Sequence, residues 1–209
     1  MRPDLLPLFP LQVVVFPRTP LPLHIFEDRY KDMVAEAIRA QSEFGVVLSK
    51  DDGIVNAGCT VRVEEVTKQY EDGRMDVITR GCRRFEVVGL NEEKAYLQGE
   101  VEFFDDDEPG PAALELQEKA LVQYRDLLAA GEFQQAPDPV VTDPQLSFQL
   151  AQALEDLDFL HLLLRNRSES DRLKRLASYL ANHVPKLRHT ARVKKLAPLN
   201  GHSSMRPGI

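Results

Sequence analysis

The sequence predicts an α+β fold, in which a small β-barrel is followed by a bundle of helices. Before Pro109-Gly110-Pro111 the segments are short, rich in β-branched residues and separated by turns that contain glycine. After this break, apolar residues recur at helical spacing almost throughout. The first pattern is typical of strands and the second of amphipathic helices. We therefore place a β subdomain at residues 1–108, a helical subdomain at 109–197 and a flexible tail at 198–209.

Residues 5–16 predict one or two short strands, which a loop then follows. The strongest part is residues 13–16, where three valines and a phenylalanine stand together. Pro17 and Pro20 come next, and each lacks a backbone N–H and restricts the residue before it. We therefore expect an extended loop after the first strands.

A single helix interrupts the strands of the first half. Its apolar positions recur at intervals of three and four residues: Tyr30, Met33, Val34, Ala37 and Ile38. This spacing places the side chains on one face of a helix of roughly three turns. The apolar run at residues 44–48 then predicts a strand that is buried on both faces.

The next segment alternates in the manner of a half-buried strand. Cys59, Val61 and Val63 are separated by polar residues, and Glu65 falls out of this phase. The change of phase indicates a bulge or the end of the strand. Asp72-Gly73 then predicts a hairpin with a type I′ turn, because that turn requires positive φ.

The returning strand of this hairpin is predicted at residues 75–80. Residues 84–88 and 96–104 are further candidates for strands. Several short strands at this spacing indicate a small closed or half-closed barrel.

Three helices are predicted after the break. The first covers residues 114–128, and a proline-containing connection follows at residues 131–144. The second has an apolar seam that steps by four and three residues through Leu146, Leu150, Ala153, Leu157, Leu160 and Leu164. Residues 168–171 resemble a capping box that opens the third helix. The buried face of this last helix contains Leu173, Leu176, Leu180, Val184 and Leu187.

Composition indicates a water-soluble globular protein. The 209 residues are 43% hydrophobic and 28% charged, with a formal net charge of −7. A negative molecule of this kind is not suited to coat nucleic acid or anionic lipid. Prolines break the apolar residues near the start, so no signal peptide is recognisable and we expect a cytoplasmic location. Cys59 and Cys82 are expected to be buried, reduced thiols, and a redox pair is the alternative.

The positive charge is concentrated in one part of the chain. Residues 165–195 contain ten Lys and Arg residues against Glu169 and Asp171. RNA could bind such a run, but only Tyr179 would supply base stacking. A solvated helix face, or one docked on the acidic barrel, is the stronger interpretation, with Arg172, Lys174 and Arg175 on the exposed faces.

Motifs that would carry catalysis are absent from the sequence. It contains no phosphate-binding P-loop, no dinucleotide fingerprint, no nucleophile elbow and no HExxH zinc motif. His24 with Cys59 or Cys82 could form a catalytic pair only if folding brought them together, and a packed histidine is the plainer interpretation. The carboxylates of residues 100–108 lack the ligand spacing of a metal site. We therefore expect neither enzymatic activity nor a metal or cofactor.

Several ordered blocks resemble the N-terminal domain family of Lon proteases. They lie at residues 6–11, 14–17, 21–30, 44–48, 58–61, 72–74, 81–85, 96–101, 147–164 and 171–173. The resemblance covers roughly residues 5–190 and implies a PUA-like β pseudo-barrel followed by a helical subdomain. In full-length Lon enzymes this region helps to engage substrates, whereas later segments hold the ATPase and the peptidase. The resemblance thus implies a stand-alone module without either of these domains.

The resemblance also implies a partner class, which is unfolded or partly folded polypeptide. A protease or chaperone system is a further candidate partner, and RNA binding by the basic helices is the alternative. The loop with Pro20, Leu21 and Pro22 is the expected contact surface, together with the junction of barrel and helices. Arg83 and Arg84 are further candidate binding residues. They precede Phe85, so that one of them should point outward while Phe85 fills the core.

Overall fold

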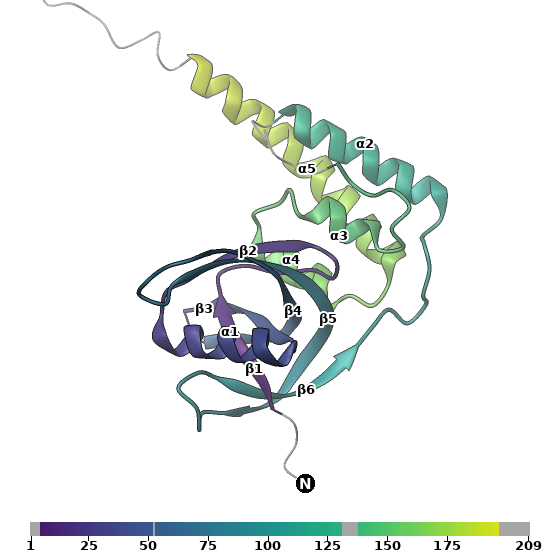
Figure 1. The fold of residues 1–209 in the computed structure, drawn as a ribbon. Coiled ribbons are helices and arrows are strands. Elements are labelled where there is room, and N and C mark those ends of the chain that lie inside the picture. The colour runs from purple at the N-terminus through teal and green to yellow at the C-terminus, as the bar shows by residue number, and fades with distance from the viewer. Residues whose placement is uncertain (1–4, 52, 131–137, 197–209) are drawn as a thin grey trace, which may run out of the picture. The chain divides into compact units, whose positions relative to one another are not determined.

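The structure is a computed structural model that describes residues 5–51, 53–130 and 138–196 (Figure 1). It confirms the α+β class, with six strands and five helices among the described residues. The chain forms two compact units, the first with residues up to Pro109 and also Leu154–Ser168, the second with Gly110–Ala153 and the chain from Glu169 onward. This differs from the single boundary predicted at residue 109, because Leu154–Ser168 packs with the strands. The predicted tail at 198–209 lies outside the described residues.

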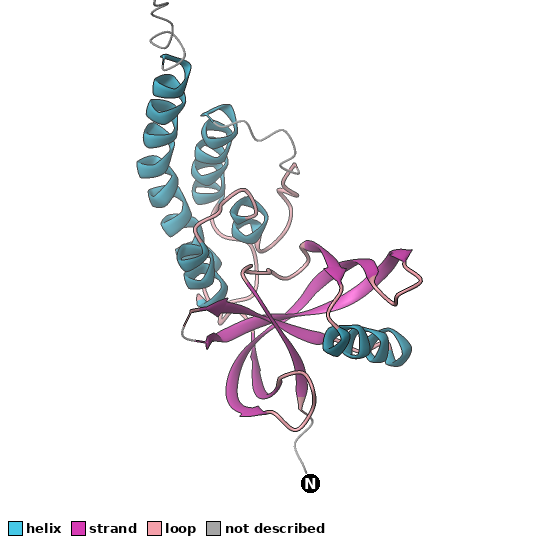
Figure 2. Ribbon diagram, turned by 90° about the vertical axis from the view of Figure 1, so that its left-hand side faces the viewer, coloured by secondary structure: helices cyan, strands magenta, loops and turns pink. Residues whose placement is uncertain are grey.

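The first unit is built on one curved sheet, drawn in Figure 2 with helix α1 beside it. Its strands are β1 (Leu6–Leu11), β2 (Pro20–Ile25), β3 (Phe44–Lys50), β4 (Gly53–Gln69), β5 (Met75–Asn91) and β6 (Gln98–Phe104). The order is β2-β5-β4-β3-β1-β6, and β6 also pairs with β5. This last pairing closes β1, β3, β4, β5 and β6 into a ring, which is the predicted barrel. Strand β2 is attached outside the ring, along β5.

The barrel is filled by large apolar side chains that pass close to glycines. Leu8, Val47 and Phe85 are fully buried and form the centre of the core. A Cβ atom at Gly45 or Gly58 would lie 2.6 Å from the Phe85 ring, so only glycine leaves room for that ring. Helix α1 (Asp28–Ala40) adds the predicted apolar stripe, which includes Tyr30, Met33, Val34 and Ala37.

Strand β2 occupies the segment for which the prolines predict a loop, so that prediction is wrong. Residues 13–16, expected to be the strongest strand, instead lead into a tight turn. Strand β2 pairs antiparallel with β5 from Pro20 opposite Arg80 to Ile25 opposite Met75. It lies at the edge of the sheet, where a missing N–H costs no ladder bond on the outer side.

The β4–β5 hairpin confirms the predicted turn and bulge, with one difference in turn type. Gly73 has φ 82°, but Asp72 does not have positive φ. Tyr70 accepts a hydrogen bond from the Gly73 amide at 3.0 Å, which makes a three-residue loop ending in a left-handed glycine rather than a type I′ turn. A register shift between Val63 and Glu65 marks the expected bulge.

The second predicted helix is two helices, so the continuous seam is misleading. Helix α3 (Leu146–Ala151) belongs to the second unit, and α4 (Leu157–Arg165) packs on β4 in the first. The Asp156 side chain accepts a hydrogen bond from the Phe159 amide at 3.0 Å and caps α4. An N-cap of this kind begins a new helix and explains the break.

The second unit contains α2 (Leu114–Ala130), α3 and α5 (Glu169–Leu196). Helix α5 packs against both α2 and α3 through the predicted leucines. Arg172 is fully buried in this unit, which corrects its expected exposed position. Its guanidinium bonds to Glu169 at 2.8 Å and to the Ser147 hydroxyl at 2.9 Å, so the charge is compensated inside the bundle. Within the described residues, none of the helices is long and apolar enough to cross a membrane.

Candidate binding groove beside helix α1

The end of helix α1 sets the geometry of the candidate site. Gln41 has φ 50°, a left-handed conformation that is uncommon for a residue other than glycine. The Ser42 amide donates to the Ala37 carbonyl at 3.0 Å, and this bond closes the last turn of the helix. The chain then turns sharply into β3, so Gln41 and Ser42 stand at the surface between the helix and the strands.

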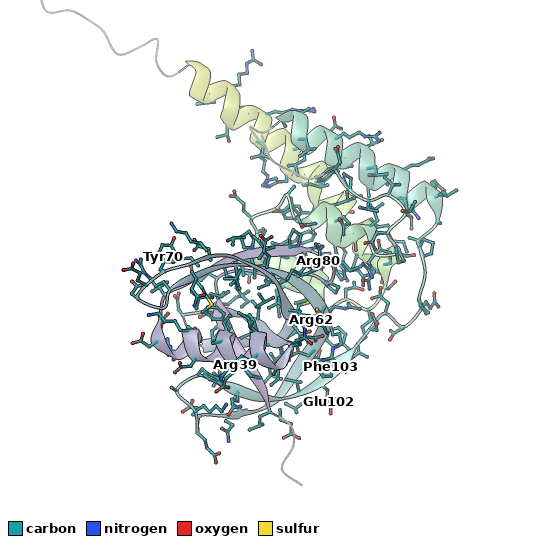
Figure 3. The ribbon with its side chains drawn as sticks, viewed as in Figure 1. Arg39, Arg62, Tyr70, Arg80, Glu102 and Phe103 are labelled. Carbon is teal, nitrogen blue, oxygen red and sulfur yellow. The ribbon has the colours of Figure 1, made fainter. Side chains whose placement is uncertain are left out.

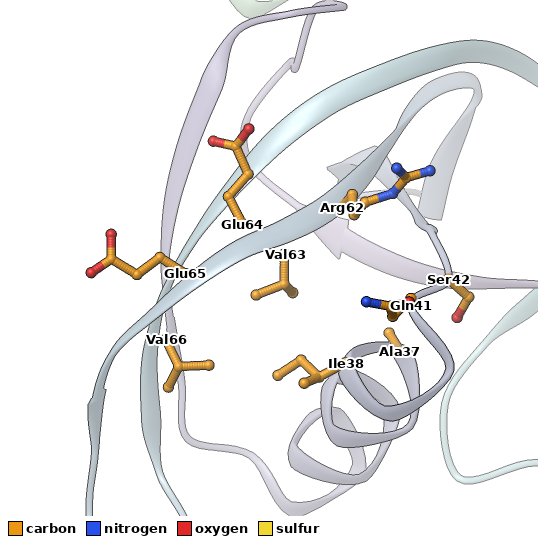
Figure 4. A pocket seen from close by; sticks show the side chains of 9 residues that line it. All are labelled: Ala37, Ile38, Gln41, Ser42, Arg62, Val63, Glu64, Glu65 and Val66. Carbon is orange, nitrogen blue, oxygen red and sulfur yellow. The ribbon is translucent and has the colours of Figure 1, made fainter.

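A first hollow of about 230 Å³ lies between α1 and β4 (Figure 4). It is lined by Ala37, Ile38, Gln41, Ser42, Arg62, Val63, Glu64, Glu65 and Val66. In Figure 4, Val63 and Val66 point toward Ile38, whereas Glu64 and Glu65 point away from the helix. The inside of this hollow is therefore apolar and its outer rim is charged.

A second hollow of about 610 Å³ continues from the first over the barrel surface. It is lined by Leu5, Leu6, Pro7, Gln41, Ser42, Glu43, Arg62, Arg83, Val101 and Phe103. Because both hollows share Gln41, Ser42 and Arg62, we treat them as one depression, the α1 groove. Phe103 is 46% exposed, and Figure 3 shows it on the same side of the first unit as Arg62.

Glu43 connects the charged side chains of the α1 groove. Its side chain is only 12% exposed. It accepts hydrogen bonds from the Thr60 hydroxyl at 2.7 Å, from Arg62 at 3.0 Å and from Arg83 at 3.0 Å. Burial by itself would raise the pKa of Glu43, but these bonds and the two arginine charges outweigh it and hold the pKa below its usual value. Glu43 is thus held ionised.

Two guanidinium groups share this one carboxylate at the mouth of the groove. Arg83 also lies 3.9 Å from the centre of the Phe103 ring, a cation–π contact that fixes both side chains. The groove therefore combines apolar walls with a mouth at which Arg62 and Arg83 outnumber the single carboxylate of Glu43, whereas Glu64 and Glu65 lie on the outer rim of the first hollow. Such a surface can bind apolar side chains and accept a carboxylate or carbonyl oxygen.

The five residues predicted for binding are found in three different settings. Pro20 and Pro22 are exposed on β2, and Leu21 between them is half-buried. Arg83 lines the α1 groove. Arg84 is 1% exposed, so it cannot contact a partner and its place among the binding residues is corrected.

Arg84 instead connects the barrel to helix α4. Its guanidinium donates to the carbonyls of Leu164 at 3.1 Å and Asn166 at 2.8 Å, and to the Asp106 carboxylate at 2.6 Å. Arg83 and Arg84 therefore point to opposite sides of β5, as their alternation on a strand requires.

The basic run at 165–195 is partly neutralised within the units that contain it. Among the described side chains of this run, acidic partners are present for several residues: Arg165 with Glu86, Arg172 with Glu169, Lys174 with Asp171, and Arg188 with Asp126. Lys174 and Arg175 are exposed as predicted. Pairing of this kind leaves less free positive charge for RNA than the sequence count suggests.

The residues considered for catalysis do not form an activated nucleophile. The Nδ1 atom of His24 lies 2.5 Å from Asp76, and the His24 ring stacks on Phe26. Cys59 is buried as expected, whereas Cys82 is only half-buried; both are free thiols, and burial raises the pKa of both. A raised pKa keeps a thiol protonated and unreactive at neutral pH. In the described part of the chain, no group of His, Cys, Asp and Glu is arranged to hold a metal ion.

Sequence reasoning missed most of the groove. Gln41, Glu43, Arg62 and Phe103 belong to no motif, and they come from three segments, the α1–β3 connection, β4 and β6, that only the closed barrel brings together. The one local signal for the groove was Glu65, which breaks the alternation of β4 and so predicts a bulge. Bulges often lie beside functional surfaces.

The fold and the groove define a class of protein, a PUA-like pseudo-barrel that presents a surface groove and carries a helical subdomain. A solved structure described as a Lon N-terminal domain protein from Xanthomonas campestris has this fold. It matches with a TM-score of 0.69 and 29% identity, over 84% of this chain and 98% of that one. The N-terminal domain of a Lon protease from the Mycobacterium avium complex matches in fold, with a TM-score of 0.60 and 18% identity over 86% of this chain.

The family model for the ATP-dependent protease La (LON) substrate-binding domain matches residues 5–189. The chain belongs to this family. A Lon protease of Parabacteroides distasonis is 31% identical over 114 residues, which are 51% of this chain and 14% of that protein. A Lon protease of Anaeromyxobacter dehalogenans is 30% identical over 113 residues, 50% of this chain and 13% of that protein. The chain therefore corresponds to a small part of the curated relatives that it matches.

Proposed function

We propose that the chain binds unfolded or partly folded polypeptides through the α1 groove, without catalysing a reaction on them. The observation that carries the proposal is the groove itself, which has apolar walls and a positive mouth. Membership of a substrate-binding domain family supports the same partner class. A cytoplasmic location and a partner protease or chaperone system stay predictions.

The chemistry of the groove suits a polypeptide better than a small polar ligand. Val66, Val101 and Phe103 offer apolar surface that a bound side chain would remove from water. Arg62 and Arg83 remain largely exposed and can each donate a further hydrogen bond to a carbonyl or carboxylate. Apolar surface combined with exposed hydrogen-bond donors is typical of surfaces that bind proteins.

The surface formed by Pro20, Leu21 and Pro22 remains a second proposed contact. These residues lie on an edge strand in the first unit, on β2. Their prolines reduce strand pairing there, so contacts would be made through side chains rather than through the backbone.

Binding to a permanently unfolded polypeptide tests the proposal. Fluorescein-labelled α-lactalbumin, reduced and carboxymethylated, is titrated with the protein and followed by fluorescence anisotropy, with native α-lactalbumin as the folded control. We expect saturable binding of the unfolded form only. Lack of binding to the unfolded form would refute the proposal.

Two matched variants locate the site. Phe103→Ser removes an exposed ring inside the groove, and Phe26→Ser removes one that is 59% exposed outside it. We expect Kd to rise about tenfold for Phe103→Ser, which is the effect of losing about 1.4 kcal/mol at a central contact. Phe26→Ser should leave Kd unchanged, and an equal loss in both variants would contradict the assignment to the groove.

A further inference from the structure

Strand β4 is much longer than the strand that pairs with it on one side. Strand β4 has 17 residues, whereas β3 has 7 and pairs only between Gly53 and Val61. Beyond Val61, residues 62–69 pair with β5 alone. Among the described residues, this stretch of β4 therefore has one edge without a strand partner.

The first hollow follows this free edge. It is lined by five consecutive residues of β4, 62–66, among which the bulge between Val63 and Glu65 lets Val63 and Val66 both point toward helix α1. No residue of β5, which occupies the opposite edge of this stretch, lines the hollow. Its far wall is helix α1, with Ile38 facing Val63 and Val66 (Figure 4).

We propose that an extended segment of the bound polypeptide adds to residues 62–66 of β4 as a further strand. This inference rests on the proposed polypeptide binding and specifies how it occurs. The free edge supplies main-chain N–H and C=O groups, which only another extended backbone satisfies as a set. Because main-chain bonds carry no side-chain information, this mode suits a module that accepts many sequences.

The hollow and the arginines define which segments fit best. An apolar side chain of the added strand enters the space between Ile38, Val63 and Val66. At the Gln41 end, Arg62 and Arg83 share the single carboxylate of Glu43, so this end carries net positive charge. The favoured occupant is an extended segment with an apolar side chain and, further along, an acidic one.

Two irregularities keep the added strand short. The β4–β5 register shifts between Val63 and Glu65 and again between Val66 and Lys68. Bulges increase the local twist and prevent a long, regular ladder from forming on the free edge. The edge therefore accepts a few residues of a partner without promoting sheet-to-sheet aggregation.

Amide hydrogen exchange of the full chain tests strand addition. The protein is measured alone and with saturating reduced, carboxymethylated α-lactalbumin. Exchange of the amides at 62–66 that do not bond to β5 should slow by about tenfold or more, because they become hydrogen-bonded. Residues 86–90, which already pair with β6, are the internal control and should not change.

Two variants complete the test. Val66→Asp places a charge in the hollow, at a side chain that is 42% exposed. The control, Val88→Asp, makes the same substitution on β5 at a side chain that is 55% exposed and does not line the hollow. Val66→Asp should weaken binding about tenfold and abolish the slower exchange, whereas Val88→Asp should do neither.

The possible outcomes separate this inference from the proposed function. If the polypeptide binds and exchange at 62–66 stays unchanged, strand addition is wrong and polypeptide binding stands. If Val88→Asp weakens binding as much as Val66→Asp, the free edge is not the site. If the unfolded polypeptide does not bind at all, the proposed function itself fails.

Discussion

Replacement of Arg84 by methionine is expected to destabilise the first unit severely. The methionine side chain retains most of the volume but cannot replace the three bonds to Leu164, Asn166 and Asp106. Arg84 is 1% exposed and the Asp106 side chain 7%, so water does not substitute for the lost donors. Removal of one partner from a buried ion pair costs about 3–5 kcal/mol. For a chain of this size, that loss lowers Tm by about 6–20 °C.

The neighbouring residue supplies a matched control. Arg83 has the same charge and also bonds to a carboxylate, Glu43, but its side chain is 56% exposed. Arg83→Met should therefore cost less than about 1 kcal/mol, the usual value for a surface pair. Urea denaturation followed by far-UV circular dichroism measures both variants. A loss below about 1 kcal/mol for Arg84→Met, or equal losses at the two positions, would refute the structural role of Arg84.

A double variant identifies the source of the loss. Asp106→Asn in the Arg84→Met background removes the buried negative charge that the single variant leaves behind. The double variant should then lose about 1–3 kcal/mol less stability than the sum of the losses of the two single variants. The two variants should have the opposite order of effect on polypeptide binding. Arg83→Met should weaken binding, whereas Arg84→Met should leave it unchanged under conditions in which the variant is folded.

Two further predictions concern the barrel. Gly81→Ala would place a Cβ atom 2.0 Å from the Phe16 carbonyl oxygen and should cost about 2–4 kcal/mol in a urea melt, whereas Gly89→Ala meets nothing closer than 3.6 Å and should be nearly neutral. Glu43 has a pKa below its usual 4.5 in the folded state, so it stabilises the fold above pH 4.5 and this contribution is lost as the pH falls through the lowered pKa. Glu43→Gln should therefore flatten the acid side of the stability curve; an unchanged slope would contradict the assignment.

Local patterns predicted the elements whose partners are near in sequence. The α1 stripe, the β4–β5 hairpin and the bulge at Glu65 each follow from residues within one segment. Strand β2 could not be found in this way, because its partners on β5 lie fifty to sixty residues away and its prolines argue locally for a loop. The edge position that tolerates these prolines is a property of the closed sheet.

Buried charges were the second kind of feature that local patterns could not predict. Arg84 and Arg172 each stand beside apolar residues in a charged stretch, where an exposed position is the general expectation. Each is buried because acceptors from distant segments satisfy its guanidinium, as Ser147 does for Arg172. The break between α3 and α4 was within reach, since Asp156 precedes the second apolar run as an N-cap would.

The free edge of β4 follows from how α1 ends. Ser42 bonds back to Ala37 and Gln41 adopts a left-handed conformation, so the chain leaves the helix abruptly and β3 begins at Phe44, opposite Val61. No residues remain to extend β3 alongside β4 beyond that pair, and a hollow rather than a strand lies between α1 and residues 62–66 of β4. The turn that lets the helix cap the barrel thereby leaves part of β4 open. A longer α1–β3 connection would close this edge, whereas the present one keeps it available to an external strand.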